Sequence, residues 1–298
     1  MIGSVSRPLR RILSAALGLA AASAIAVPAA QAEPAIWVVH GKNNSTVYLF
    51  GTVHTLRPNA VWKTPKVEQA LGESQELWLE IADIDNQAAA IPLIQKYGLD
   101  LKQPLSAKLD DAYKAKLAAA AKTIGYPPAV LDRMQPWLAG LTLTMAPLVK
   151  AGYDPKSGVD LMLKAAATQK GEPVKGFETM EQQIRYFADL SPELQIAFLK
   201  DTLDDYEKAT TQLDRIEKSW EAGDVKAISR AMNSDLKAKA PALYDLLLVQ
   251  RNKAFARQIE AKLQSPGVAF VAVGAAHLAG PDSVQAQLAK DGVKAQRF

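Results

Sequence analysis

Apolar and polar positions divide this chain into short apolar runs and longer stretches with helical spacing. Five runs have the length and composition of β-strands, namely residues 36–40, 46–50, 76–81, 173–177 and 267–274. The first two flank a Gly-Lys-Asn-Asn-Ser turn sequence and therefore predict a hairpin. The last is apolar throughout, as expected of a strand that is buried on both faces.

Between these runs the apolar residues recur at helical spacing. We expect a short helix near residues 66–71, four or five helices over 85–170, and long amphipathic helices through residue 220 and over 241–263. Ser191-Pro192-Glu193 is a start signal for the second helical block. Pro281-Asp282 predicts the start of the last helix, and residues 293–298 are expected to form a final edge strand.

Strands predicted near both ends of the chain favour one sheet and one domain. We predict an α/β fold with a single domain over residues 33–298. Its central mixed β-sheet is built from N- and C-terminal strands, and large helical insertions cover it. The pattern leaves the order of the strands open.

Residues 1–32 have the pattern of a secretory signal peptide. Three arginines precede an apolar stretch of 16 residues, 12–27, and Ala30-Gln31-Ala32 is a small-x-small cleavage site. We expect cleavage after Ala32, export to the periplasm and no stable membrane anchor afterwards. The alternative is a retained anchor, although a spanning helix needs about 20 apolar residues.

Removing this segment changes the charge balance. The whole chain has 35 Lys+Arg and 31 Asp+Glu, and the segment holds three arginines and no acid, which leaves 32 basic against 31 acidic groups. Such a balance gives no support for a nucleic-acid partner. The chain has no cysteine, which excludes a disulfide framework, a thiol nucleophile and a Cys-ligated metal. Any metal must therefore bind to His, Asp or Glu.

Several standard catalytic signatures are absent from the sequence. There is no His-Glu-x-x-His, Gly-x-Ser-x-Gly, phosphate-binding Gly-rich loop or Gly-x-Gly-x-x-Gly. These absences disfavour classical zincins, α/β-hydrolases, nucleotide triphosphatases and dinucleotide enzymes.

Polar residues instead follow four of the predicted strands. His54, Glu80, Glu178 and His277 each lie at or just beyond a strand end, and ligands bind at that edge of open α/β sheets. Both histidines stand in the frame Gly-x-x-His. Neutral imidazoles and a carboxylate are good ligands for a divalent metal that keeps one position open for water. The pattern therefore indicates a metal site.

Each of these residues also has a purely structural interpretation. Either histidine can be a hydrogen-bonded structural residue, and Glu80 can be a strand-end glutamate that reaches solvent. Glu178 can belong to a helix start together with Thr179. His40, the third histidine, precedes the hairpin turn and is interpreted as a surface residue outside the site.

Three further polar residues gain interest only from the resemblance described next. Arg251 and Asn252 lie in a predicted helix, where a charged residue normally faces solvent. Asp160 is most simply an exposed acid in the first turn of a helix.

Five segments resemble the successive motifs of the TraB/GumN family, in the same order and over about residues 46–290. They are Tyr48-Leu49-Phe50-Gly51-Thr52-Val53-His54, Glu76-Leu77-Trp78-Leu79-Glu80, Gly176-Phe177-Glu178-Thr179, Arg251-Asn252 and Val273-Gly274-Ala275-Ala276-His277-Leu278-Ala279-Gly280-Pro281-Asp282. The family includes the TIKI proteins, which are metal-dependent peptidases, and the PrgY proteins, which limit peptide pheromone activity.

The resemblance implies a ChaN/erythromycin-esterase-like α/β core and a set of site residues. His54 and His277 match the two motif histidines, and Glu80 and Glu178 match the acidic positions. Arg251 with Asn252 matches a polar pair of the family, and Asp160 matches its Gly-Val-Asp element.

The leading hypothesis is an exported metal-dependent hydrolase of the metalloprotease type, acting on a peptide or a small molecule. His54, Glu80 and His277 would hold Mn²⁺, Co²⁺ or Zn²⁺ and activate water. Glu178 would act as general base or second ligand, and Arg251 or Asn252 would steady the oxyanion.

Two other hypotheses remain open from the sequence. One is a non-catalytic periplasmic protein that binds haem, a metal or a peptide, because ChaN-type relatives suggest haem or iron binding. The other is a scaffold whose site is vestigial.

Overall fold

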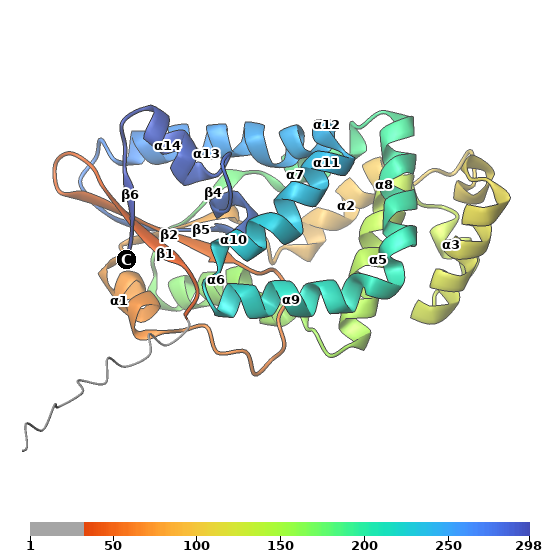
Figure 1. The fold of residues 1–298 in the computed structure, drawn as a ribbon, viewed down its shortest axis with the longest axis horizontal. Coiled ribbons are helices and arrows are strands. Elements are labelled where there is room, and N and C mark those ends of the chain that lie inside the picture. The colour runs from red at the N-terminus through yellow and green to blue at the C-terminus, as the bar shows by residue number, and fades with distance from the viewer. Residues whose placement is uncertain (1–32) are drawn as a thin grey trace, which may run out of the picture. The chain divides into compact units, whose positions relative to one another are not determined.

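A mixed β-sheet with the strand order β4-β3-β5-β2-β1-β6 organises the structure (Figure 1). The computed structural model describes residues 33–298, and the expected signal segment, residues 1–32, lies outside them. The strands are β1 (Ile36–His40), β2 (Ser45–Thr52), β3 (Glu76–Ile81), β4 (Val174–Glu178), β5 (Gly267–Gly274) and β6 (Ala295–Arg297). All predicted strands are confirmed, and so is the α/β single-domain fold with its mixed sheet.

Helices fill most of the sequence between the strands. The α-helices are α1 (Pro65–Glu73), α2 (Gln87–Gly98), α3 (Asp111–Ile124), α4 (Pro128–Leu131), α5 (Pro136–Lys150), α6 (Val159–Lys170), α7 (Met180–Ala188), α8 (Pro192–Asp205), α9 (Ala209–Glu221), α10 (Val225–Ile228), α11 (Asp235–Lys239), α12 (Pro241–Tyr244), α13 (Arg251–Lys262) and α14 (Val284–Lys290). Short 3₁₀ turns are η1 (Leu105–Lys108), η2 (Pro155–Ser157), η3 (Tyr206–Lys208) and η6 (Ala275–Leu278). Two π-helical segments are η4 (Ser229–Ser234) and η5 (Asp245–Gln250). Within residues 33–298 no helix combines the length and the apolar character that crossing a bilayer requires.

The C-terminal strand β5 lies between the N-terminal strands β2 and β3. It runs parallel to both, and β3 runs parallel to β4, whereas β1 and β6 are antiparallel additions at one edge. The carboxyl ends of β2, β5, β3 and β4 therefore meet at one edge of the sheet. Thr52 pairs with Gly274, so the two Gly-x-x-His frames leave the sheet side by side.

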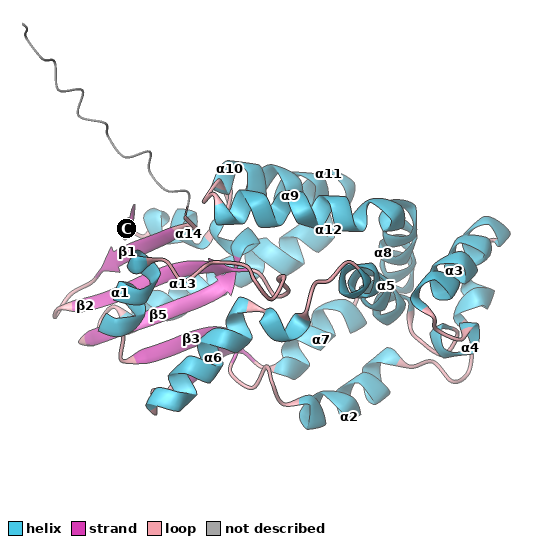
Figure 2. Cartoon of the chain, turned by 90° about the horizontal axis from the view of Figure 1, so that it is seen from below, coloured by secondary structure: helices cyan, strands magenta, loops and turns pink. Residues whose placement is uncertain are grey.

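Alternating side chains of the central strands build a core on each face of the sheet. Tyr48, Phe50 and Phe270 pack on the face that α1, α6 and Trp220 of α9 cover. Leu49 and Val271 pack on the opposite face, under α13 and α14. Figures 1 and 2 show these two helical layers on either side of the strands.

A third apolar cluster lies among the helical insertions. It joins Leu117 of α3, Leu131 of α4, Leu143 of α5 and Leu199 of α8. This cluster gives the insertions their own packed interior beside the carboxyl edge of the sheet (Figure 2).

Two predicted helices differ from the observed ones. Gly280 takes a positive φ of 85°, and Ser283 Oγ accepts a hydrogen bond from the Ala286 N–H, so the last helix begins at Val284 instead of Pro281. The predicted helix over 241–263 is interrupted by the π-helical segment η5. Apolar spacing does not reveal a local change from α- to π-helical hydrogen bonding.

Trp220 connects the helical insertion to the first Gly-x-x-His frame. Its indole N–H donates to the Gly51 carbonyl at 2.7 Å, and its ring is fully buried. Trp220→Phe removes this buried hydrogen bond and should lower the free energy of unfolding by about 1–3 kcal/mol, measured by urea denaturation. Trp37→Phe is the control, because Trp37 is half-buried and its indole N–H has no acceptor in the described part of the chain. Equal losses for both variants would contradict this role of Trp220.

Candidate functional site

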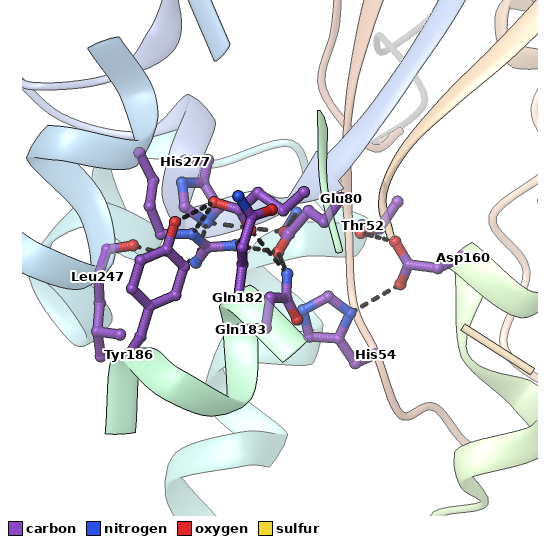
Figure 3. A network of polar contacts seen from close by, with 12 residues as sticks. Thr52, His54, Glu80, Asp160, Gln182, Gln183, Tyr186, Leu247 and His277 are labelled. Atoms are coloured by element: carbon purple, nitrogen blue, oxygen red, sulfur yellow. Dashed lines mark hydrogen bonds and ion pairs between the residues drawn. The ribbon is translucent and has the colours of Figure 1, made fainter. Parts of the chain in front are cut away.

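Five of the predicted site residues lie together at the carboxyl edge of the sheet. His54 follows β2, Glu80 and Glu178 end β3 and β4, His277 follows β5, and Arg251 begins α13. Figure 3 shows His54, Glu80 and His277 facing a common centre. The strand-end pattern in the sequence thus identified one spatial cluster.

Arg251 lies at the centre of this cluster and is largely buried. Its Nε and Nη2 donate to the two carboxylate oxygens of Glu178, both at 2.8 Å, and Nη2 also donates to Glu80 Oε2 at 2.6 Å. Its Nη1 contacts His277 Nε2 and the Leu247 carbonyl, each at 3.1 Å. Burial opposes its charge, but both glutamates together raise the pKa of Arg251 above its usual range. The interpretation of Arg251 as a solvent-facing helix residue is wrong.

Glu80 is buried at the end of β3 and remains ionised. Burial alone would raise its pKa, but the interaction with His277, the charges of Arg251 and His54 and the hydrogen bond from Gly274 hold the pKa well below its usual range. The Gly274 N–H donates to Glu80 Oε1 at 2.7 Å. The alternative of a strand-end glutamate that reaches solvent is therefore wrong.

Glu178 is bound on both carboxylate oxygens. Besides Arg251 it accepts hydrogen bonds from Gln183 Nε2 and the Tyr186 hydroxyl, both at 3.0 Å. Thr179 and Gln182, not Glu178, form the capping box of α7. The capping interpretation of Glu178 is therefore wrong, and its charge is directed at Arg251.

His277 is buried and neutral. Its Nδ1 lies 2.5 Å from Asn252 Oδ1, an acceptor-only atom, so the ring proton is on Nδ1 and Nε2 presents its lone pair. Burial lowers the pKa of His277 to about 3. Asn252 Nδ2 donates to the Asp282 carbonyl at 2.8 Å, so both polar ends of Asn252 are engaged. Asn252 is buried and fixes the His277 ring; it does not face solvent.

His54 is held by a buried aspartate. Its Nδ1 lies 2.8 Å from Asp160 Oδ2, and Asp160 Oδ1 accepts from the Thr52 hydroxyl at 2.7 Å. Asp160 is only 3% exposed, so its interpretation as an exposed first-turn acid is wrong. The Asp160 charge raises the pKa of His54 to about 9, although 61% of the His54 side chain is exposed.

A glycine lets α6 bring Asp160 this close. The Val159 N–H donates to the Val53 carbonyl at 3.1 Å, and a Cβ on Gly158 would lie 2.4 Å from the His54 carbonyl oxygen. Only glycine permits this approach of two backbones.

Gly274 marks the point where the candidate ligands converge. A Cβ at this position would lie 3.2 Å from both His54 Nε2 and Glu80 Oε1, and 3.7 Å from a carbon of the His277 ring. His277 Nε2 is 3.6 Å from Glu80 Oε1. Among residues 33–298, however, no group of three or more His, Asp or Glu side chains is already arranged as a metal site.

The chemistry of these donors nevertheless suits a divalent cation. In each histidine an oxygen acceptor binds Nδ1 and leaves Nε2 for a ligand, which is the usual arrangement of metal-bound histidines. When His54 has lost its extra ring proton, three carboxylates and one guanidinium leave two negative charges at the site. Arg251 would compete with such a cation, because its Nη1 already contacts His277 Nε2.

Gln183, Tyr186 and Asn233 belong to the site but were missed from the sequence. Gln183 also donates to Glu80 Oε2 at 2.9 Å, and it lies three residues before Tyr186 on α7. The helix start directly after Glu178 could have indicated Gln183 and Tyr186, because residues three apart on that helix lie on one face, near Glu178. Asn233 donates to the Ala276 and Ala279 carbonyls at 3.0 and 2.7 Å and so holds the turn that carries His277. No sequence pattern indicated Asn233.

Comparison with known proteins identifies relatives over almost the whole described chain. A family model described as "TraB/PrgY/gumN family" matches residues 35–297. The uncharacterised protein YbaP of Escherichia coli (strain K12) is 24% identical over 82% of this chain and 88% of its own length. YbaP of Shigella flexneri is 27% identical over 62% of this chain and 68% of its own length. An uncharacterised Treponema pallidum protein is 21% identical over 85% of this chain and 79% of its own length. No solved structure matches the chain.

Arg251→Met should destabilise the protein strongly, because it leaves Glu80 and Glu178 buried without their counter-charge. Breaking a buried ion pair by removing one partner costs about 3–5 kcal/mol, which urea unfolding at pH 7 would measure. Adding Glu178→Gln to Arg251→Met should recover part of this loss. A double variant as unstable as the single one would show that the charges are not the cause.

Asp160→Asn should lower the pKa of His54 from about 9 toward the ordinary value of 6.5, because the main charge that stabilises the imidazolium is removed. NMR signals of the His54 ring in chelator-treated protein report this pKa. A titration from about pH 5 to about pH 10 covers the expected pKa values of both proteins. The exposed His40 lies at the opposite end of the hairpin strands and provides an internal reference for the ring signals. An unchanged His54 titration would contradict the assigned pairing.

Proposed function

This chain belongs to the TraB/PrgY/gumN family, and from that premise we propose that it is an exported metal-dependent hydrolase that cleaves peptides. The metal would be Mn²⁺, Co²⁺ or Zn²⁺, held by His54, Glu80 and His277. The sequence pattern of residues 1–32 supports export.

One observation carries the proposal. Two histidines from opposite ends of the chain present Nε2 toward the same glutamate, and each has Nδ1 fixed by a side-chain oxygen. Two histidines with purely structural roles would not both need Nδ1 held by a side-chain oxygen and Nε2 directed at one glutamate. Histidines that bind a metal are usually oriented in this way by a second residue. Gly274 keeps the space between His54 Nε2 and Glu80 Oε1 free of a side chain.

The metal, when bound, would polarise the scissile carbonyl and make a water molecule more acidic. Asp160 holds the His54 ring, and Asn252 holds the His277 ring in the tautomer that leaves Nε2 unprotonated. Asn252 thus has a positioning role in the proposal, because its Oδ1 holds the His277 ring while its Nδ2 donates to the Asp282 carbonyl.

Glu178 and Arg251 would handle the proton and the developing negative charge. Glu178 is the second carboxylate of the site and would take the proton from the attacking water. Once it is neutral, its ion pair with Arg251 weakens, and the guanidinium charge becomes available to the oxyanion. Glu178 therefore serves first as the partner of Arg251 and then as the base.

Metal content tests the proposal first. The mature protein, purified without chelator, should hold nearly stoichiometric transition metal by elemental analysis, and His54→Ala and His277→Ala should lose it together with peptide cleavage. Removing one of three ligands should weaken metal affinity by at least tenfold, since even loss of an orienting residue costs about 10–100-fold. Glu178→Gln should retain the metal and lose turnover.

His40→Ala is the matched control, because His40 is exposed and remote from the cluster. It should keep both metal and turnover. Cleavage that persists in His54→Ala or His277→Ala would refute the mechanism. Protein that takes up none of these metals but shows a Soret band on haem titration, shifted by His277→Ala, would instead support the binding-protein alternative.

A further inference from the structure

An apolar cavity of about 200 Å³ opens directly beside the site. Arg251 and His277 form its polar end, and Figure 3 shows Tyr186 and Leu247 on that side of the cluster. The remaining wall is mainly apolar and includes Phe187, Met232, Leu236, Leu247 and Leu248, with Gln183 and Asn233 as further polar residues. The charge of Arg251 is already paired with two glutamates, so the cavity offers no free charge to a ligand.

Both π-helical segments of the described chain contribute to this cavity. Met232 and Asn233 come from η4, and Leu247 and Leu248 come from η5. Such segments are rare and less stable than α-helix, and they occur frequently at functional sites. Their presence on two sides of one cavity indicates that its shape is maintained against local helical preference.

Asn233 connects the cavity wall to the site. The residue is 4% exposed, and its Nδ2 holds the His277 turn by donating to the Ala276 and Ala279 carbonyls. The π-helical segment η4 thus supplies both an apolar wall residue, Met232, and the residue that holds the His277 turn.

A second cavity, of about 500 Å³, lies on the other side of Leu236, which lines both cavities. Its walls include Leu194, Phe198 and Leu243, with Asp201 and Lys239 at polar positions.

We propose that the cavity lined by Met232, Leu236 and Leu248 is the specificity subsite for a leucine-, methionine- or phenylalanine-like side chain next to the cleaved bond. This inference rests on the proposed function, because it names the substrate class of the same site. It excludes acidic and basic side chains from this position.

Peptide binding without turnover tests the subsite. The probes are acetylated pentapeptide amides Ala-Ala-Xaa-Ala-Ala with Xaa as Leu, Phe, Asp or Lys, titrated calorimetrically into chelator-treated protein. We expect the Leu and Phe peptides to bind at least about tenfold more tightly than the Asp peptide, which corresponds to about 1.4 kcal/mol.

Met232→Glu converts the apolar wall into an acidic one and should invert the preference in favour of the Lys peptide. Met145→Glu is the matched control, because Met145 on α5 is 37% exposed, as is Met232, but does not line the cavity. A gain of Lys binding cannot arise from misfolding.

The outcomes separate this inference from the proposed function. Equal binding of all four peptides, or an unchanged preference in Met232→Glu, overturns the subsite whether or not the protein hydrolyses peptides. A preserved apolar preference without cleavage by Mn²⁺-, Co²⁺- or Zn²⁺-loaded protein refutes hydrolysis and leaves the subsite as part of a peptide-binding protein.

Discussion

The ion pairing of Arg251 with Glu80 and Glu178 is the interaction on which the rest of the site depends. Two carboxylates near the ends of adjacent parallel strands would repel each other in a nearly water-free environment, so the pair needs a counter-charge. Arg251 provides that charge from α13, a helix contributed by a distant part of the chain. The same guanidinium contacts His277 Nε2, so the arrangement of strands, helix and second histidine is fixed by one side chain.

Strands and helices contribute different kinds of residue to the site. Strand ends provide the groups that would contact a metal or a substrate, and parallel pairing of β2, β5, β3 and β4 brings them to one edge. Helices provide the residues that orient those groups: Asp160 from α6, Gln183 and Tyr186 from α7, and Asn252 from α13. Two histidines, each oriented by a different helix, can hold fixed positions although they follow flexible frames of glycine and small residues.

The sequence predicted the strands and the cluster of strand-end residues, because these follow from local patterns. Apolar runs identify strands, and a polar residue directly after such a run must lie at an edge of the sheet. The helical residues of the site could not be found in this way. Asp160 and Arg251 are typical surface residues by helical spacing, and only tertiary contacts turn them inward. The π-helical segments and Asn233 depend on local hydrogen bonding and on long-range packing that spacing does not encode.

The hydrogen bonds around Arg251 also determine what a metal would do in the proposed function. Apart from His54 Nε2, the polar groups at the centre already have partners: Arg251 binds both glutamates and His277, and Asp160 binds His54. The buried charges of the site are therefore paired within the chain, unlike those of small zinc domains, in which metal binding supplies the folding free energy. Because the pKa of His54 is about 9 and Arg251 contacts His277 Nε2, a metal in the proposed site would compete with a proton at His54 and with Arg251 at His277. Arg251 also lines the apolar cavity, so its charge would lie beside the carbonyl group of a substrate bound there.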